Sequence, residues 1–375
     1  MAKYKLGDIV TLLNGRAYLM PELQDSGKYR ILRVGNLSGG NDSWYYSDME
    51  LDENKYCENG DLLYAWACNF GPHIWREEKV IYHYHIWKLV ENKEKVDRTY
   101  LYYYLLHQTP FYLGGVNGAT MVHITKKNME KKTVYIPSSL NVQHRIASIL
   151  STYDTLIENN TKRIRLLEKM AENLYKEWFV RFRFPGHENV EMENGLPKGW
   201  KVKKYEDEFN VKYGKGLPID KLTKDGFPVF GSNGQIGYYT SYMYETPQIL
   251  ISCRGASSGV VNISLPKSFI TNNSLICEMT NETESVFEYL KYCFLNTNLV
   301  QYQTGSAQPQ ITINNIVKLK LLIPSTDVQI KFADKVRTLD KEVGNLQHQN
   351  SLLARQRDLL LPRLMSGKLE VKVKE

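Results

Sequence analysis

Two long stretches of the chain carry apolar residues at heptad spacing, whereas the region before each stretch alternates short apolar runs with turn residues. The first stretch follows Pro137 and the second follows Pro324. A helix over residues 140–182 would be about 65 Å long at about 1.5 Å per residue. Such a helix is longer than most small domains are wide, so its own domain cannot bury it.

The apolar stripe of each stretch is as broad as that of a helix packed in a bundle. Pro185 ends the first pattern, and Pro362 closes the second. The economical solution is an antiparallel pair, a stalk that holds one domain at each end. The predicted seam positions are Ile146, Tyr153, Asn160, Leu167, Leu174 and Trp178 in the first helix, and Phe332, Leu339, Leu346, Leu353 and Leu360 in the second.

One seam position is polar. Asn160 falls in the apolar stripe, and Asn350 lies on the matching face of the second stretch. A polar seam residue fixes the register of two helices at some cost in stability. The alternative is that both asparagines face solvent.

The segment that leads into each long helix occurs twice. Ile124-Thr125 matches Ile311-Thr312 at an offset of 187 positions, and Pro137-Ser138 matches Pro324-Ser325. Farther upstream, Asn14-Gly-Arg matches Tyr213-Gly-Lys. A period near half the chain length indicates two copies of one domain-plus-helix unit, because solenoid repeats are far shorter.

Each copy begins with short strands that Gly, Asn, Asp and Pro interrupt. One helix interrupts each set, near residues 98–108 and 285–296. We therefore expect an α+β fold: two globular mixed domains, separated by a pair of long antiparallel coiled-coil helices, with an internal pseudo-twofold repeat. The expected parts are a first domain (1–137), a first long helix (138–185), a linker (186–196), a second domain (197–324), a second long helix (325–368) and a C-terminal tail (369–375).

Composition and charge favour a globular protein of the cytoplasm. The chain is 42% hydrophobic, has no run of 18 apolar residues and starts without the apolar region of a signal peptide, so no membrane association is expected. Five cysteines without a Cys-x-x-Cys pair argue against a disulfide framework and a zinc site. The net charge of +7 permits phosphate binding but does not require it.

The duplicated Ile-Pro-Ser element, which feeds a helix that begins Gln-x-x-Ile/Phe-Ala, resembles the specificity subunits (HsdS) of type I restriction-modification systems. The segment 164–175 and the tail 359–369 carry the same resemblance, which covers the whole chain. In that family two target-recognition domains each read half of a split DNA sequence, and the long helices bind two methyltransferase subunits. The resemblance implies a non-catalytic scaffold whose partners are double-stranded DNA, two methyltransferase subunits and restriction/translocase subunits. It also implies no cofactor on this chain, with S-adenosylmethionine, Mg²⁺ and ATP in the partner subunits.

Geometry favours the same role. Half-sites on one face of B-DNA are separated by whole turns of about 34 Å, and the expected stalk spans one to two such turns. Helix length should therefore set the spacer between the half-sites. Because the polar loops of the two copies differ, the target should be asymmetric and not a palindrome.

Basic and amide side chains near the turns are the candidates for DNA contacts. Arginine pairs bidentately with guanine, and asparagine or glutamine with adenine. The alternative for any single one of them is a solvated surface role, so the set carries the prediction. Its members are Arg16, Arg30, Arg33 and Arg76 in the first domain and Lys215, Asn233, Arg254 and Gln308 in the second.

Several patterns that spell catalytic motifs lack the context that the chemistry needs. Ser264 and Lys267 match Ser-x-x-Lys without its companion motifs. His83 and His85 are expected to alternate onto one face of a strand, where two ligands are too few for a metal. The chain also has neither a phosphate loop nor a methyl-donor loop.

Two other functions remain open from the sequence. A stand-alone nuclease or methyltransferase would need a carboxylate cluster or a donor loop, neither of which is found. A pure interaction protein would use the stalk for oligomerisation and the mixed domains for protein binding. Salt-dependent DNA binding separates this last function from DNA reading, because phosphate contacts weaken steeply as salt rises.

Overall fold

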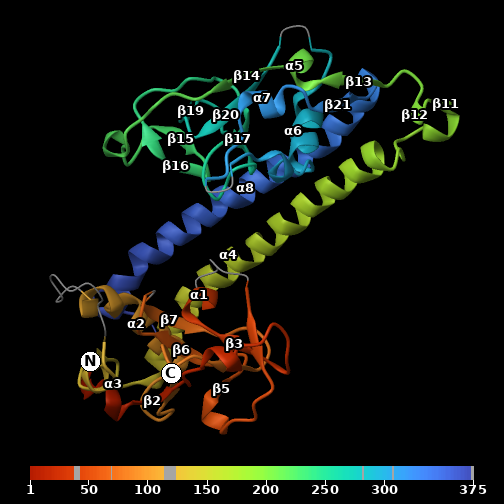
Figure 1. Ribbon diagram of the computed structural model, residues 1–375. Helices are drawn as coiled ribbons and strands as arrows, with labels where there is room; N and C mark the ends of the chain where they lie inside the picture. The colour runs from red at the N-terminus through yellow and green to blue at the C-terminus, as the bar shows by residue number, and fades with distance from the viewer. Residues whose placement is uncertain (38–42, 69, 114–123, 281–282, 306–307, 373–375) are drawn as a thin grey trace. The chain divides into compact units, whose positions relative to one another are not determined.

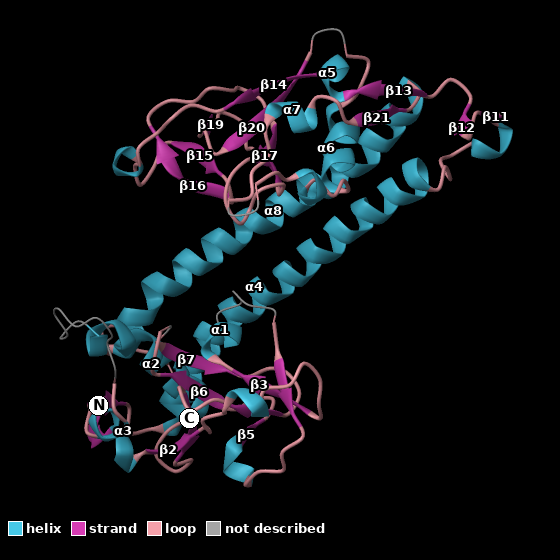
Figure 2. Ribbon diagram, viewed as in Figure 1, coloured by secondary structure: helices cyan, strands magenta, loops and turns pink. Residues whose placement is uncertain are grey.

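The structure is a computed structural model that describes residues 1–375 except 38–42, 69, 114–123, 281–282, 306–307 and 373–375. The chain divides into two compact units (Figure 1). The first unit comprises Met1–Thr161 and His348–Glu375, and the second comprises Lys162–Gln347. Each unit combines strands, short helices and two segments of the long helices (Figure 2), as the α+β fold class requires.

The strands of the first unit form two sheets and a ribbon. The main sheet has the antiparallel order β2-β9-β6-β7. The second sheet has the order β4-β3-β8-β5, in which β3 and β8 are parallel, and the ribbon pairs β1 with β10. The strands are β1 Ala2–Lys5, β2 Val10–Asn14, β3 Tyr29–Leu32, β4 Tyr45–Ser47, β5 Tyr56–Cys57, β6 Leu62–Ala65, β7 Gly71–Ile74, β8 Val80–Tyr82, β9 Ile86–Glu91 and β10 Thr133–Ile136.

The second unit repeats this plan. Its main sheet has the order β14-β20-β17-β18, its second sheet the order β16-β15-β19 with β15 and β19 parallel, and its ribbon pairs β13 with β21. The duplication inferred from the sequence is thus a duplication of strand order. The strands are β13 Lys201–Lys204, β14 Phe209–Tyr213, β15 Phe227–Gly231, β16 Gly234–Tyr239, β17 Ile249–Ser252, β18 Val261–Ile263, β19 Phe269–Ile270, β20 Ser274–Met279 and β21 Lys320–Ile323, besides a hairpin of β11 Met192–Glu193 and β12 Leu196–Pro197.

His83 and His85 were predicted to lie on one face of a strand, and this prediction was wrong. β8 ends at Tyr82 and β9 begins at Ile86, so His83 and His85 lie in a turn and not on one face of a strand. The reason is topological. β8 pairs with β3 in one sheet, whereas β9 pairs with β2 and β6 in the other, and the chain must change sheets between them.

Two helices are far longer than the others. α4 spans Leu140–Tyr175 and continues into a π-helical turn at Lys176–Val180, and α8 spans Thr326–Met365. Pro362 lies inside α8 and does not end it, contrary to the sequence prediction. The shorter helices are α1 Val34–Leu37, α2 Arg98–Leu113, α3 Lys126–Glu130, α5 Tyr205–Glu208, α6 Phe287–Leu295 and α7 Ile313–Ile316.

Within the first unit the segments of α4 and α8 run antiparallel. Arg357 of α8 pairs with Asp154 of α4 at 2.5 Å, and Asn160 of α4 donates to Asn350 of α8 at 3.0 Å. The residue number in α8 therefore falls as the residue number in α4 rises, so the two helices run in opposite directions. Asn160 is 6% exposed, so it does not face solvent in this unit.

The second unit shows the same antiparallel arrangement. Arg163 of α4 pairs with Glu342 of α8 at 2.9 Å, and the Tyr175 ring contacts the Phe332 ring edge-on at 6.3 Å. Of the predicted seam positions in the two units, some are buried and the rest are half-buried. The buried ones are Ile146, Asn160, Trp178, Phe332 and Leu346, and the half-buried ones are Tyr153, Leu167, Leu174, Leu339, Leu353 and Leu360.

A buried glutamine joins the start of each long helix to its own unit. Gln143 donates from Nε2 to the Pro137 carbonyl at 2.8 Å, and Gln329 donates in the same way to the Pro324 carbonyl at 2.8 Å. Each Oε1 accepts the backbone N–H of the residue that precedes the shorter helix, α2 or α6. Both glutamines are fully buried, which explains why this residue stands in both copies of the repeat.

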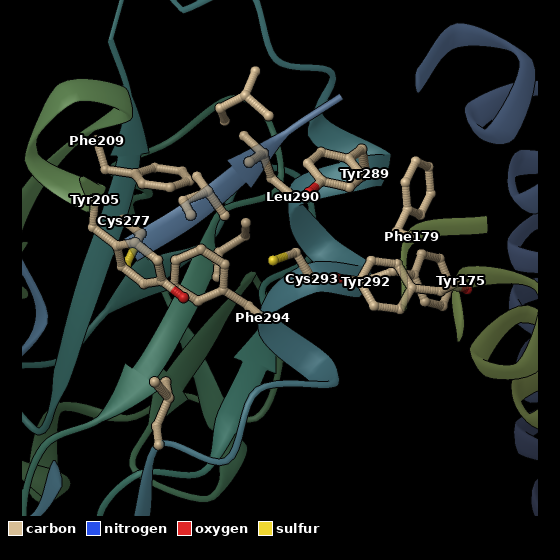
Figure 3. Packing of buried hydrophobic residues seen from close by; sticks show 14 of the residues in the cluster. Tyr175, Phe179, Tyr205, Phe209, Cys277, Tyr289, Leu290, Tyr292, Cys293 and Phe294 are labelled. Carbon is tan, nitrogen blue, oxygen red and sulfur yellow. The ribbon is translucent and has the colours of Figure 1, made fainter. Parts of the chain in front are cut away.

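Aromatic side chains of α6 bind the sheet of the second unit to its helix pair (Figure 3). Toward the sheet, Phe294 packs against Tyr205 at 4.8 Å and Phe209 at 5.2 Å between ring centroids. Toward α4, Tyr289 meets Phe179 at 4.7 Å. The core is therefore continuous from the strands to the helices, and the strand ends are held on a rigid base.

Candidate DNA interface

Polar and aromatic side chains gather at one end of the main sheet of each unit. The register places Asn14, Trp87 and Tyr64 side by side at this end in the first unit. Tyr213, Leu275 and Ile251 take the same places in the second unit. We call the residues that continue from these strands the strand-end surface; it comprises residues 15–18, 66–68 and 83–85 in the first unit and 214–217, 253–255 and 271–273 in the second.

A turn at the centre of each strand-end surface is held by equivalent backbone hydrogen bonds. His83 N donates to Leu32 O at 2.9 Å in the first unit, and Thr271 N donates to Phe230 O at 2.9 Å in the second. Five further pairs repeat in the same way: Gly15 N to Ile86 O and Gly214 N to Ser274 O; Arg16 N to Tyr82 O and Lys215 N to Ile270 O; Tyr84 N to Arg16 O and Asn272 N to Lys215 O; Trp66 N to His85 O and Cys253 N to Asn273 O; Ile86 N to His83 O and Ser274 N to Thr271 O. The β8–β9 turn (83–85) and the β19–β20 turn (271–273) therefore share one backbone conformation but no side chain.

A glycine lets each turn approach the neighbouring loop. A Cβ on Gly15 would lie 2.4 Å from the Tyr82 and His83 carbonyl oxygens. A Cβ on Gly214 would lie 2.2 Å from the Thr271 carbonyl oxygen. Both distances are too short for any side chain, so the glycine that precedes Arg16 and Lys215 is a requirement of this architecture.

In the second unit two predicted cations lie beside the β19–β20 turn. The Lys215 carbonyl accepts from Asn272 N, and Arg254 directly follows Cys253, whose N–H donates to the Asn273 carbonyl. Lys215 and Arg254 are both exposed, and within the described part of the chain neither side chain forms an ion pair. Both are therefore available to a phosphate.

Two predicted amides lie in loops that are bonded to this surface. Asn233 is exposed between β15 and β16, in a hairpin that Ser274 binds by donating from Oγ to the Gly231 carbonyl at 3.1 Å. Gln308 is exposed in a loop whose Gln310 forms a backbone bridge with Arg254. Hydrogen bonds thus link the segments that carry the four residues predicted for the second unit.

In the first unit two predicted arginines are held by internal ion pairs. Arg16 lies on the strand-end surface and binds Glu22 with both terminal nitrogens, at 2.7 and 3.0 Å. Arg30 pairs with Glu77 at 2.8 Å, and its guanidinium lies 4.5 Å from the centre of the Trp44 ring. These interactions stabilise the unit and leave both side chains less available to DNA.

The other two arginines of the first unit follow strands that belong to different sheets. Arg33 follows β3 next to the β8–β9 turn, and its guanidinium lies 4.4 Å from the Tyr45 ring centre. Arg76 follows β7 at the opposite end of the main sheet and pairs with Glu158 of α4 at 3.1 Å. The structure therefore brings Arg16 and Arg33 to one surface but not Arg76.

Aromatic rings replace amides in the β8–β9 turn. Tyr84 is 39% exposed, and its ring centre lies 4.0 Å from that of His85 and 4.4 Å from that of His83. Trp66 supports the turn by donating from Nε1 to the Tyr84 carbonyl at 2.8 Å. Burial, with smaller effects from His85 and Arg33, lowers the pKa of His83 to about 4, so this imidazole is neutral at physiological pH.

The sequence prediction missed the residues of the two turns. Tyr84 and the pair Asn272-Asn273 stand at the centres of the surfaces, yet they share no sequence pattern. The sequence signal for the position of these turns was the match of Gly15-Arg16 with Gly214-Lys215, because each turn forms hydrogen bonds with its own copy of this dipeptide.

The described residues add no support to the catalytic patterns noted in the sequence. Among them there is no group of three or more His, Cys, Asp or Glu that could hold a metal ion. Ser264 accepts the Gln248 N–H on its hydroxyl at 2.8 Å, and Lys267 pairs with Glu245 at 3.3 Å, so both have structural partners. No helix of the described chain is sufficiently long and apolar to cross a bilayer.

Comparison with known proteins decides the family. The family model described as "Type I restriction modification DNA specificity domain" matches residues 1–169 and again 197–354, most of the chain. The chain belongs to the type I restriction-modification specificity subunits. The two matches begin at residues 1 and 197, where the two expected domains of the internal repeat begin.

Curated relatives and a solved structure agree with this assignment. The chain is 29% identical over 309 residues to the MjaIX specificity subunit of Methanocaldococcus jannaschii, covering 74% of this chain and 71% of the relative. It is 22% identical to the MjaVIII specificity subunit of the same organism, covering 98% and 92%. The crystal structure of a type I S subunit from M. genitalium shares the fold with a TM-score of 0.59 at 19% identity, covering 97% and 95%. This specificity subunit is therefore not itself the enzyme, and catalysis resides in the partner subunits of the complex.

Proposed function

We propose that this specificity subunit reads an asymmetric, two-part DNA sequence, with one half-site for each unit. The observation that carries the proposal is the pair of equivalent turns, which place different exposed side chains on the same backbone. A duplicated framework with different contact residues reads two different short sequences in equivalent ways.

We further propose that the long helices bind two methyltransferase subunits, to which restriction subunits are added. Leu166 of α4 is 65% exposed in the second unit, and Leu352 of α8 is 45% exposed in the first. The two positions differ by 186, the offset that also separates Gln143 from Gln329. Exposed leucines at equivalent positions support two equivalent docking sites, because large exposed apolar side chains on helices often mark protein interfaces.

The chemistry of methylation and cleavage then belongs to those partners. S-adenosylmethionine, Mg²⁺ and ATP are proposed to bind there, and this chain is proposed to bind no cofactor. Its own contribution is to position the catalytic subunits on duplex DNA. The length of α4 and α8 is proposed to set the spacer between the half-sites.

The test is the DNA binding of the specificity subunit in complex with its methyltransferase subunits. Binding to a genomic site that the complex methylates should fall by about 10³-fold or more between 50 and 200 mM salt, because several phosphates are contacted. The methylated sites should show two separated, dissimilar half-sites. A salt-independent interaction, or methyl transfer by the purified chain alone, would contradict the proposal in favour of an interaction protein or a stand-alone enzyme.

A further inference from the structure

We propose that the β19–β20 turn reads adenine in one half-site through the side-chain amides of Asn272 and Asn273, and that the β8–β9 turn is its counterpart for the other half-site, with Tyr84 as the contact residue. The inference rests on the proposed function and assigns the reading to named side chains. None of these residues was singled out from the sequence.

The side-chain amides of the two asparagines have no hydrogen-bond partner among the residues that the structure describes. Both residues are exposed, and within the described residues neither side chain makes a hydrogen bond, whereas the Asn272 N–H donates to the Lys215 carbonyl and the Asn273 carbonyl accepts from Cys253 N. A carboxamide offers one donor and one acceptor in one plane, which matches N7 and the N6 amino group of adenine in the major groove. A side-chain amide that has a fixed backbone position and no partner in the described residues is suited to these two hydrogen bonds with adenine.

The backbone of the turn is rigid enough to position these amides. Each residue of the turn forms a backbone hydrogen bond to a strand or to a strand-end loop, and the turn leaves no room for a Cβ on Gly214. Thr271 and Ser274, which flank the pair, are buried. Little conformational entropy is then lost when the amides meet a base, which favours specific binding.

The neighbouring cations favour the same surface. The exposed Lys215 and Arg254 border the asparagines from two different loops. Cations beside an amide pair would bind phosphates on the rim of the groove while the amides face the base edges. In the first unit Glu22 neutralises the equivalent Arg16, so the β8–β9 turn would depend more on its aromatic side chains.

Tyr84 replaces Asn272 at the equivalent position. Its ring packs against the rings of His83 and His85, whose centres are themselves 4.8 Å apart, and Trp66 donates a hydrogen bond to its carbonyl. A tyrosine presented in this way offers an apolar face and one hydroxyl but no paired donor and acceptor. The two turns therefore differ in the bases they favour, as an asymmetric target requires.

The experiment is selection of bound duplexes from a pool randomised in both half-sites, with the complete complex of specificity and methyltransferase subunits. Asn272→Asp and Asn273→Asp are nearly isosteric, so the fold is retained, but the donor becomes an acceptor. We expect each to lower affinity for the selected wild-type sequence by about 5- to 150-fold. The preference should move from adenine toward cytosine at one position of one half-site, and the other half-site should stay unchanged.

A matched control and a transplant sharpen the test. Asn210→Asp changes an exposed asparagine at the far end of β14 and should leave both half-sites unchanged. Replacing the β8–β9 turn by Thr-Asn-Asn (His83→Thr, Tyr84→Asn, His85→Asn) should alter only the half-site that the asparagine variants leave unchanged. Retained selectivity in all of these variants would overturn the assignment of the turns but not the proposed function. A wild-type complex without any base preference would overturn both.

Discussion

Asn160 on α4 donates a hydrogen bond from Nδ2 to Oδ1 of Asn350 on α8, with 3.0 Å between the two atoms. Asn350 in turn lies 3.3 Å from the Thr161 hydroxyl, to which its own amide donates. This polar layer interrupts an apolar seam in the first unit. Shifting one helix along the other would separate these groups, so the pair selects one alignment.

The polar layer leads to a first prediction. Although a polar seam residue costs stability relative to an apolar pair, Asn160→Leu alone should destabilise the protein by about 1–3 kcal/mol, because the half-buried Asn350 remains and its Oδ1 loses the amide that donates to it. The measurement is chemical denaturation of the complete chain. Asn159→Leu, at the exposed neighbouring position, is the control and should change stability by less than about 0.5 kcal/mol. Equal effects of the two variants would show that the layer has no role.

A buried carboxylate in the second unit predicts a pH dependence. The Glu208 side chain is 0% exposed and accepts hydrogen bonds from Lys203 at 2.6 Å and Ser285 at 2.9 Å, and another from Thr283. Burial alone would raise the pKa of this carboxyl, but the hydrogen bonds outweigh it and lower the pKa below its ordinary value of 4.5. The unfolded chain therefore binds the proton more readily than the folded chain does.

This difference stabilises the fold above about pH 4.5, and the stabilisation is lost as pH falls through the lower pKa of the folded state. Glu208→Gln should cost about 1–3 kcal/mol at pH 7, and this cost should shrink progressively as pH falls below about 4.5. Urea unfolding of the wild-type protein and the variant at several pH values measures this difference in the free energy of unfolding. Glu206→Gln, at an exposed carboxylate, is the control and should have little effect at any pH. A cost for Glu208→Gln that stays constant down to pH 3.5 would be inconsistent with this account.

The exposed leucines predict the stoichiometry of the complex. Leu166→Glu or Leu352→Glu alone should leave one methyltransferase subunit bound, and the double variant none, because a charge would replace the apolar contact. Native mass spectrometry counts the subunits. Asn173→Glu introduces the same charge at an exposed polar position of α4 and should leave two bound. If the double variant still binds two methyltransferase subunits, the docking sites lie elsewhere.

Helix length predicts the spacer. Inserting one heptad after Thr161 and one after Gln347 lengthens both helices at equivalent positions. The spacer between the half-sites should grow by about 10 Å, or about three base pairs. Sequencing the sites that the variant complex methylates gives the spacer directly, and an unchanged spacer would exclude the helices as the ruler.

The regular parts of the fold were predictable from the sequence because their signals are local. Heptad spacing revealed α4 and α8, and the repeated Pro137 and Pro324 marked where each begins. The buried Gln143 and Gln329 were visible as repeated residues, although their function as links between helix and domain emerged only from the hydrogen bonds.

The contact surface was predictable only in part, because it depends on pairing between distant strands. Lys215 and Arg254 were predicted from residue type and turn context, and they meet at one surface. The β8–β9 turn stayed hidden inside an apolar run, since only the change of sheet between β8 and β9 breaks it. Nothing local in the sequence related Tyr84 to Asn272, because backbone hydrogen bonds, not side chains, make the two turns equivalent.

The central claim is that each unit reads its own half-site, and an exchange of domains tests it most directly. Residues 1–137 would be replaced by the corresponding part of another specificity subunit with a known target, and the sites methylated by the resulting complex would be sequenced. The account predicts that one half-site changes to that of the donor while the other half-site and the spacer remain. A change in both half-sites, or in neither, would contradict it.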